Sequence, residues 1–538
     1  MIKIKLIIVN IKKTGILALI SIFSCFSCIN AQSIKHGFKF GQFIDYLDNY
    51  YVDTVNAEQI VEDAIIGILE NLDPHSTYIP ADEIKKRREP LQGNFEGVGI
   101  QFNILNDTLY VISPISGGPS ERVGVMAGDK IIKVDGENIA GVGLTNEDVF
   151  RLLRGKKGTE VTISVKRRNV TKFIDFHITR DKIPLYSVDA SYMVDDSTGY
   201  IKINRFSATT IEEFKKAAIE LKNKNARNLI LDLTNNGGGY LDAAVKLADE
   251  FLQNQKLIVY TEGIHAPKFE YLATVDGNFE QGKVIILIDE GSASASEIVS
   301  GAVQDWDRGI VIGRRSFGKG LVQREMPLHD GSALRITVAK YYTPSGRLIQ
   351  KPFDKGIDNY HREILNRYSN GELMSSDSIN FPDSLKYKTL EMGRIVFGGG
   401  GIMPDIFVPF DTSFFSNYYR DIVRKGILNN FVLEYVDINR NKLLKDYESF
   451  SDYNEFFKID EKLFVRFTSF AEKEGVKKNK DDLNVSKPQL DMMLKALIAR
   501  NLFGNDEFFQ IYNTTNKTYL KAIEVINTWN KYKKELHL

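Results

Sequence analysis

The chain has 538 residues, more than a single hydrophobic core normally organises, so we expect several domains. Apolar residues make up 43% of it and aromatic residues 11%, which excludes a largely disordered chain. Lysine plus arginine and aspartate plus glutamate both total 70. The excess of positive charge typical of nucleic-acid-binding proteins is missing, and we expect no nucleic-acid partner.

The first residues of the chain have the pattern of an export signal. Lysines at positions 3, 5, 12 and 13 precede an uncharged apolar run, 14–29, and Ala31 follows as a cleavage point. This is the layout of a secretory signal peptide, which we assign to residues 1–31. The run of about 16 residues is shorter than the ~20 that a membrane-spanning helix needs. We therefore predict an exported protein of the periplasm or cell envelope.

Both cysteines of the chain, Cys25 and Cys28, lie in this segment. They make a lipid anchor, and through it an association with the membrane, the alternative to a soluble form. If the segment is removed, the mature protein has no cysteine, which excludes thiol catalysis, disulfide bonds and thiolate metal sites. The seven histidines are scattered and show no pair at metal-ligand spacing on a helix, so the pattern indicates no metal site.

The segment after the signal peptide is predicted to be helical. In 57–72, apolar residues recur at helical spacing and form one buried face, namely Ile60, Val61, Ala64, Ile65, Ile68 and Leu69. Asp73 and Pro74 then end the helix. We interpret residues 32–92 as a small N-terminal helical domain.

Residues 93–180 change to short strands separated by glycine turns. One helix interrupts them, with Thr145 as its N-cap and Asp148 three residues later. Its buried face is predicted to consist of Val149, Leu152 and Leu153. The pattern predicts a small mixed barrel. Because backbone amides beside a strand and a helix can bind a peptide carboxylate, the glycine-opened strand at 97–102 is a candidate peptide site.

Residues 181–410 alternate apolar strands with amphipathic helices, which predicts an α/β layered domain. Strands are expected at 199–203, 228–233, 284–288 and 309–312, and helices at 210–222, 241–252 and from about 294. The remaining residues, 411–538, are rich in Phe, Tyr, Lys and Asp and are predicted to form a mostly helical extension. We recognise no chemistry in that extension.

Two segments of the α/β region show small residues at a predicted helix start. The first, 231–239, ends a strand in the glycine run 237–239, where backbone amides can approach a ligand; a plain strand-to-helix turn is the alternative. The second, 289–297, opens a helix with Ser294 among small residues. Such a serine is either a nucleophile, with the Ala295 amide facing its oxyanion, or an ordinary helix N-cap.

A third segment, 313–320, differs by one residue from a phosphate-binding P-loop. Gly320 occupies the place of the Mg²⁺-binding hydroxyl, and 321–327 is predicted to be extended rather than helical. Both features disfavour nucleotide binding.

The lysine of this segment, Lys319, has another use, because a neutral lysine can accept the proton of a serine nucleophile. Lowering its pKa by ~3 units costs roughly 4 kcal/mol and requires burial or nearby positive charge. Arg314 and Arg315 are candidates to supply that charge. A solvated loop lysine is the alternative.

These segments resemble the carboxyl-terminal processing peptidases, a family of serine endopeptidases with a Ser–Lys dyad. The resemblance covers roughly residues 40–410. It rests on five motifs in the family's order: Leu72-Asp73-Pro74-His75-Ser76, Gly97-Val98-Gly99, Asn235-Asn236-Gly237-Gly238-Gly239, Ser292-Ala293-Ser294-Ala295-Ser296-Glu297, and Phe317-Gly318-Lys319-Gly320 with Val322-Gln323. The serine-rich motif and the FGKG motif together are specific to the family.

The resemblance implies a role for each site residue. Ser294 would be the nucleophile, Lys319 the general base, and Gln323 the residue that orients the lysine. The amides of Ala295 and Gly238 would form the oxyanion hole.

The resemblance also implies an architecture. Residues 181–410 would be a crotonase-like (ClpP/crotonase-type) α/β peptidase core, and residues 93–180 a PDZ domain that binds a substrate C-terminus. The binding residues would be Gly97, Val98, Gly99 and Ile100. The partners would be protein or peptide substrates, with a homo-oligomer or an adaptor protein left open, and no cofactor is implied.

A catalytically inactive, PDZ-containing binding or scaffold protein of the cell envelope is the alternative from another functional class. An incomplete dyad would indicate it, whereas both dyad positions are filled here. A P-loop ATPase is the third interpretation. The sequence therefore predicts a serine-type endopeptidase that processes or degrades exported proteins near their C-termini through an acyl-enzyme.

Overall fold

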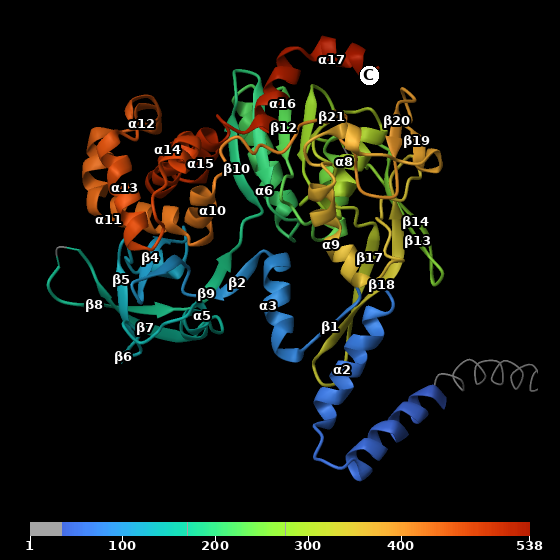
Figure 1. Cartoon of the computed structure of the whole chain (residues 1–538), viewed down its shortest axis with the longest axis horizontal. Coiled ribbons are helices and arrows are strands. Elements are labelled where there is room, and N and C mark those ends of the chain that lie inside the picture. The colour runs from blue at the N-terminus through green and yellow to red at the C-terminus, as the bar shows by residue number, and fades with distance from the viewer. Residues whose placement is uncertain (1–34, 169, 275, 538) are drawn as a thin grey trace, which may run out of the picture. The chain divides into compact units, whose positions relative to one another are not determined.

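The computed structural model describes residues 35–168, 170–274 and 276–537 (Figure 1). The predicted signal peptide, 1–31, with both cysteines, lies outside the described residues. The chain divides into two compact units: residues up to Pro80 together with Glu325–Ile336, and Ala81–Arg324 together with Thr337–Leu538.

The smaller unit contains a helix over 35–50, then α2 (Ala57–Glu70) and β1 (Thr77–Ile79). Asn56 caps α2, and β1 pairs antiparallel with the first residues of β18 (Ala333–Tyr342). The predicted buried face of α2 is only partly correct. Leu69 is buried but Ile68 is 56% exposed. Helical periodicity marks an apolar face, but among the described residues α2 contacts chiefly β1, so this face is only partly buried.

The turn between α2 and β1 is built on Asp73. One oxygen of its carboxylate accepts from the amides of His75 (2.8 Å) and Ser76 (2.9 Å), and the other accepts from the Ser76 hydroxyl (2.6 Å). In the Asp-Pro-His-Ser motif, the aspartate side chain therefore stabilises the turn by hydrogen bonds to the residues that follow it. This turn connects the end of α2 to the start of β1.

The first part of the larger unit is an antiparallel sheet with two helices. After α3 (Ala81–Gln92), β2 (Asn94–Gly97) pairs with β9 (Asp181–Pro184). The sheet order is β3 (Ile100–Leu105), β4 (Thr108–Pro114), β5 (Lys130–Val134), β7 (Glu160–Lys166) and β8 (Ile174–Thr179), with β6 (Glu137–Asn138) on β5. The helices are α4 (Pro119–Arg122) and α5 (Asn146–Leu153).

The capping box predicted for α5 is confirmed. The Thr145 side chain accepts from the Asp148 amide, and the Asp148 side chain accepts from the Thr145 amide. The single strand predicted over 97–102 is wrong in detail. One strand ends at Gly97 and the next begins at Ile100, because Gly99 between them has a left-handed φ of +76°.

The α/β core is a six-stranded sheet flanked by helices (Figure 1). Its strand order is β10 (Val188–Met193), β11 (Thr198–Ile203), β12 (Asn228–Asp232), β15 (Val284–Ile288), β16 (Ile310–Gly313) and β21 (Ile406–Phe407). Only β10 is antiparallel to its neighbour. One face packs on α6 (Thr210–Asn223), α7 (Leu241–Asp249) and α8 (Ala295–Asp305). The predicted strand and helix alternation is thus confirmed.

The segments that connect the strands of this sheet form further strands and one further α-helix. A hairpin of β13 (Leu257–Gly263) and β14 (Ala266–Leu272) pairs with the second half of β18. The segment after Lys319 is extended, as predicted, and forms β17 (Leu321–Pro327). Then come α9 (Ile357–Ser369) and the pair β19 (Lys386–Lys388) and β20 (Ile395–Phe397).

The C-terminal extension is helical, as predicted, and it has two parts. The first helices share a separate core: α10 (Asn417–Arg424), α11 (Ile427–Asp446), α12 (Phe450–Phe456), α13 (Glu461–Lys473), α14 (Lys480–Leu502) and α15 (Asn505–Tyr512). The last two, α16 (Lys517–Asn527) and α17 (Trp529–Glu535), cover the second face of the core sheet. This end of the extension therefore completes the α/β core.

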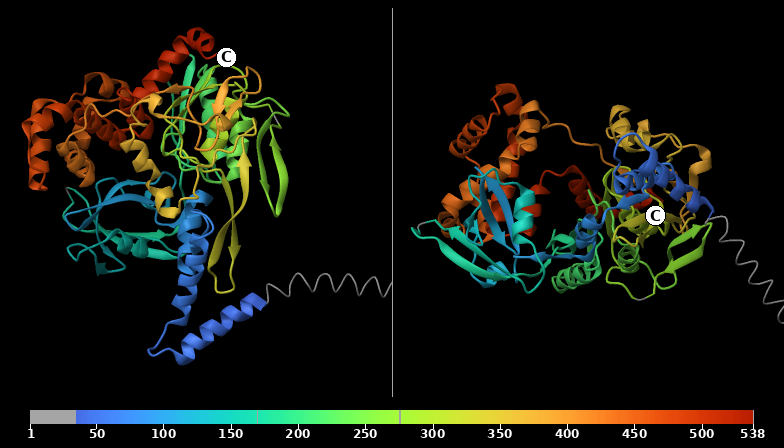
Figure 2. Two further views of the ribbon diagram at one scale, coloured as in Figure 1. Left: turned by 45° about the vertical axis from the view of Figure 1, so that its right-hand side comes forward. Right: turned by 90° about the horizontal axis from the view of Figure 1, so that it is seen from below.

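The first part of the extension lies beside the antiparallel sheet, where orange helices border blue-to-cyan strands in both views of Figure 2. Asn430 of α11 accepts from Asn103 of β3 at 2.7 Å, and Asp437 pairs with Arg168 at 3.8 Å. In the described part of the chain, no helix combines the length and apolar character needed to cross a membrane.

Candidate active site

The three candidate segments meet at one edge of the core sheet. They follow β12, β15 and β16, which are adjacent and parallel, so their carboxyl ends lie side by side. Loops at this edge of a parallel sheet are the usual place for a ligand site in α/β proteins. The fold therefore brings together residues that are up to about 90 positions apart in the sequence.

Ser294 differs from the two serines beside it. The side chains of Ser292 and Ser296 are buried, and their hydroxyls donate to the carbonyls of Leu233 (2.8 Å) and Asn236 (2.9 Å). Ser294 is partly exposed and precedes α8 with φ +54° and ψ −109°. An ordinary N-cap residue has extended backbone angles, and a strained non-glycine residue at a loop edge is typical of a functional site.

The glycine run packs directly against this serine. Gly238 has φ +95°, and a Cβ added to it would lie 2.9 Å from the Cβ of Ser294. Only glycine allows this approach. In this structure the Gly238 amide donates to the Asn236 side chain at 2.9 Å, so it already has an acceptor. Its assignment to the oxyanion hole stays a prediction, as does that of Ala295.

A buried carboxylate joins the serine to the lysine loop. Glu297, which is 0% exposed, accepts at one oxygen from the amides of Ser294 (2.7 Å) and Lys319 (2.9 Å). Its other oxygen accepts from the Ser316 hydroxyl (2.5 Å) and the Gly318 amide (2.7 Å). Burial raises the pKa of Glu297 above its ordinary value, against the lowering effect of these four donors.

Tyr341 of β18 joins the same two residues through their carbonyls. Its hydroxyl lies 2.5 Å from the Lys319 carbonyl oxygen and 3.2 Å from that of Ser294. The backbone amides of Ser294 and Lys319 thus both donate to the Glu297 carboxylate, and their backbone carbonyls both accept from the Tyr341 hydroxyl.

The sequence patterns assigned no role to either Glu297 or Tyr341. The Ser-x-x-Glu spacing of Ser294 and Glu297 is a capping-box signal that could have found the carboxylate. No local pattern marks Tyr341.

The arginines before Lys319 do not supply unbalanced charge to it, contrary to expectation. Arg314 pairs with Glu290 at 2.7 Å, and Arg315 pairs with Glu372 at 2.5 Å. Each positive charge is therefore compensated by a carboxylate. Gln323, predicted to orient the lysine, lies on β17 and donates to the Thr337 hydroxyl at 3.3 Å. Its role stays a prediction.

The predicted peptide site lines a small cavity in the antiparallel sheet region. The cavity holds about 40 Å³ and lies between the start of β3 and α5. Its lining includes Val98, Gly99 and Ile100, together with Phe95, Phe102, Val149, Phe150, Leu153 and Arg154. Gly97 bridges to Arg154 beside it. Because β3 is the edge strand of its sheet, a peptide can add there as a further strand.

Comparison with known proteins relates these regions to described families. The model for peptidase family S41 matches residues 197–359, ending within α9, and a PDZ domain model matches 110–167. A family of unknown function (DUF8443) matches 418–504. The carboxy-terminal-processing protease of Bartonella bacilliformis is 39% identical over 317 residues, which cover 58% of this chain and 72% of that protein. The carboxy-terminal processing protease CtpB of Bacillus subtilis is 36% identical, covering 58% and 65%.

Two solved structures are also similar. The photosystem II D1 C-terminal processing protease is 29% identical with a TM-score of 0.33, over 56% of this chain and 81% of that chain. The PDZ domain of the Vibrio cholerae carboxy-terminal protease, solved with a peptide, is 32% identical with a TM-score of 0.16, over 17% and 99%. On the sequence matches, the chain belongs to the carboxy-terminal processing proteases, serine peptidases of family S41, and it carries a PDZ domain.

Proposed function

We propose that Ser294 is the nucleophile and Lys319 the general base of this protease. The observation that carries the proposal is the shared carboxylate of Glu297, which binds the amides of both residues. The partial exposure and strained backbone of Ser294 support its choice over Ser292 and Ser296. The core would have the crotonase-like fold, and here the proposed site lies at the carboxyl ends of adjacent parallel strands.

The reaction follows from these roles. The neutral amine of Lys319 takes the proton of the Ser294 hydroxyl as its oxygen attacks the peptide carbonyl. The oxyanion then receives hydrogen bonds, with the Ala295 amide and an amide of the run 237–239 as the proposed donors. Protonated Lys319 gives its proton to the leaving amine, which leaves an ester on Ser294. Water, deprotonated by Lys319, hydrolyses that ester. Gln323 would orient the lysine.

The PDZ domain is proposed to hold the C-terminus of the substrate. The edge strand β3 would pair with the peptide, and the amides at 97–100 would receive its carboxylate. Protein substrates whose C-termini are free would then be held while the core cuts them. We further propose export to the periplasm or cell envelope by the 1–31 segment, with a lipid anchor as the alternative form.

The dyad is tested by single substitutions assayed on a tail-tagged, unfolded protein. Ser294→Ala and Lys319→Ala are each expected to lower kcat at least about 10⁴-fold, as removal of a nucleophile or its base does elsewhere. Ser296→Ala is the matched control two residues away, because its hydroxyl is used inside the fold. It is expected to retain activity within about tenfold.

Two results would remove the dyad. Activity retained in folded Ser294→Ala but lost in Ser296→Ala would move the nucleophile. Activity retained in Lys319→Ala would exclude the lysine as base. If the wild-type protein cuts no substrate but binds C-terminal peptides, the inactive scaffold is correct instead.

A further inference from the structure

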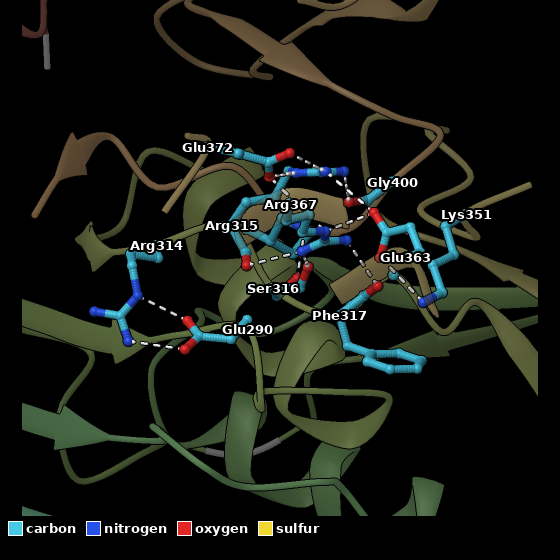
Figure 3. A network of polar contacts seen from close by, with 12 residues as sticks. Glu290, Arg314, Arg315, Ser316, Phe317, Lys351, Glu363, Arg367, Glu372 and Gly400 are labelled. Atoms are coloured by element: carbon cyan, nitrogen blue, oxygen red, sulfur yellow. Dashed lines mark hydrogen bonds and ion pairs between the residues drawn. The ribbon is translucent and has the colours of Figure 1, made fainter. Parts of the chain in front are cut away.

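The loop that carries Lys319 is bound from its other side by one buried arginine. Arg367 of α9 is 2% exposed, and its guanidinium donates to three successive carbonyls (Figure 3). Nη1 reaches Ser316 (2.7 Å) and Arg315 (3.3 Å), and Nη2 reaches Phe317 (3.1 Å). Nε donates to Glu363 at 2.6 Å. All three nitrogens of the planar guanidinium therefore donate, two of them to this loop and one to Glu363.

Arg367 and Glu297 bind the two ends of the same peptide group. The carbonyl of Phe317 accepts from Arg367, and the amide of Gly318, which belongs to the same planar unit, donates to Glu297. In a trans peptide these groups point in opposite directions. The peptide is therefore fixed between a guanidinium on one side and a carboxylate on the other.

The next two peptide groups are fixed in the same way. The Gly318 carbonyl accepts from the Lys351 amide at 2.9 Å, while the Lys319 amide donates to Glu297 at 2.9 Å. The Lys319 carbonyl accepts from Tyr341, while the Gly320 amide donates to Gln350 at 2.8 Å. Three consecutive peptide groups thus have both ends bound, which sets the backbone from which the Lys319 side chain starts.

The arginine is itself held by a compensated charge network (Figure 3). Glu363 also binds Lys351 at 3.1 Å, and Arg315 pairs with Glu372 at 2.5 Å. The Lys351 ammonium lies 4.0 Å from the Phe317 ring and 4.1 Å from the Tyr360 ring. Burial lowers the pKa of Arg367 and that of Lys351, so both cations depend on these partners.

We propose that Arg367 is a positioning residue for the catalytic lysine, which it holds in place through the carbonyls of residues 315–317. The proposal rests on the proposed role of Lys319 as the base. Arg367 lies on the part of α9 beyond the peptidase match. A displacement of a catalytic group by about 1 Å can cost about 100-fold in rate, so loss of this contact affects the chemical step rather than substrate binding.

The test compares Arg367→Lys with Arg362→Lys, the same change on the exposed side of the same helix. Lysine keeps the charge but cannot reach three carbonyls with a planar fork. We expect kcat of Arg367→Lys to fall about 10- to 100-fold while KM stays within about twofold. Arg362→Lys is expected to match the wild type. An unchanged kcat in folded Arg367→Lys would overturn the proposal.

Hydrogen exchange separates positioning from general stability, in a Ser294→Ala background that prevents self-cleavage. Positioning predicts faster exchange of the amides of Gly318, Lys319 and Gly320 only. Faster exchange throughout the core would show a structural role instead and overturn the proposal.

If Arg367→Lys does not fold, Glu363→Gln takes its place, because it removes the charge that holds Arg367. Glu363→Gln is expected to lower kcat about three- to tenfold, a smaller loss than that of Arg367→Lys. An unchanged kcat in Glu363→Gln would overturn the proposal.

Failure of the proposed function has a different signature. Activity retained in Lys319→Ala would remove the base, whatever Arg367→Lys does. Full loss in Lys319→Ala with no effect of Arg367→Lys would remove only the positioning role.

Discussion

The proposed active site and the proposed peptide-binding cavity of the PDZ domain use their backbone in opposite ways. In the lysine loop, the three peptide groups from Phe317 to Gly320 are bound at both ends, by Arg367, Glu297, Lys351, Tyr341 and Gln350. In the PDZ domain, β3 is an edge strand beside a cavity of about 40 Å³. A site that performs chemistry needs its groups fixed before the substrate arrives, whereas a site that reads a peptide leaves strand pairing for the peptide to complete.

Apart from the dyad residues themselves, Glu297→Gln is the change in this site that is expected to lower kcat most. The carboxylate accepts four hydrogen bonds, whereas a glutamine would present its NH₂ group to some of the same donors. We expect kcat to fall about 100- to 1,000-fold, since each hydrogen bond to a buried charge contributes about 1.5–3 kcal/mol.

The measurement is steady-state cleavage of a tail-tagged protein, with circular dichroism to verify folding. Glu212→Gln, at an exposed position in the first turn of α6, is the control. A folded Glu297→Gln protein with wild-type kcat would show that the carboxylate is not needed to hold the dyad.

Phe150→Ala is expected to weaken peptide binding at the PDZ domain without changing the chemical step in the core. Phe150 is 44% exposed, lines the cavity between the start of β3 and α5, and contacts Phe102 with ring centroids 5.7 Å apart. Loss of this apolar wall is expected to raise KM about three- to tenfold for substrates with a free C-terminus and to leave kcat unchanged. Phe173→Ala, also exposed in the PDZ domain, is the control. An equal rise in KM for amidated and free C-termini would argue against recognition of the carboxylate.

The smallest expected effect concerns how the stability of the PDZ domain depends on pH through Asp148, at the start of α5. The hydroxyl of Thr145 and the guanidinium of Arg151 lower the pKa of Asp148 to about 2. A carboxylate whose pKa is lowered on folding stabilises the fold above its unfolded pKa of ~3.9, and loses that effect as the pH falls towards 2. Asp148→Asn is therefore expected to lower the Tm of the PDZ domain slightly at pH 7. The difference from wild type should shrink between pH 4 and pH about 2.

Calorimetry of the full chain at several pH values measures this difference. The control is Asp175→Asn on β8, a carboxylate at another position of the same sheet region. A difference in Tm that stays constant down to pH about 2 would contradict the capping role.

Local sequence patterns predicted the parts of the site that lie within single segments. The glycine run, the serine at the start of α8 and the lysine loop each follow a short apolar strand, and the structure places all three at one sheet edge. The capping box of α5 was likewise visible, because its two residues are three positions apart. Such features depend on local backbone geometry, which neighbouring residues determine.

The parts that were missed depend on contacts between distant segments. Tyr341 reaches Ser294 across 47 positions, and Arg367 reaches Phe317 across 50. The helix α16 covers the core sheet from the far end of the chain. Ile68 was predicted to be buried and is exposed for the same reason. Helical periodicity marks an apolar face, but it does not show whether another element covers that face. The register in which distant elements meet leaves no pattern within either segment.

The most direct test of the account is to locate the acyl-enzyme. A peptide ester substrate would be mixed with the enzyme, quenched in acid within the first turnover, and the acylated residue identified by peptide mass spectrometry. The proposed dyad predicts acylation of Ser294, which is absent in Ser294→Ala and at least about 100-fold slower in Lys319→Ala. Acylation of Ser292 or Ser296, or an unchanged rate in Lys319→Ala, would contradict it.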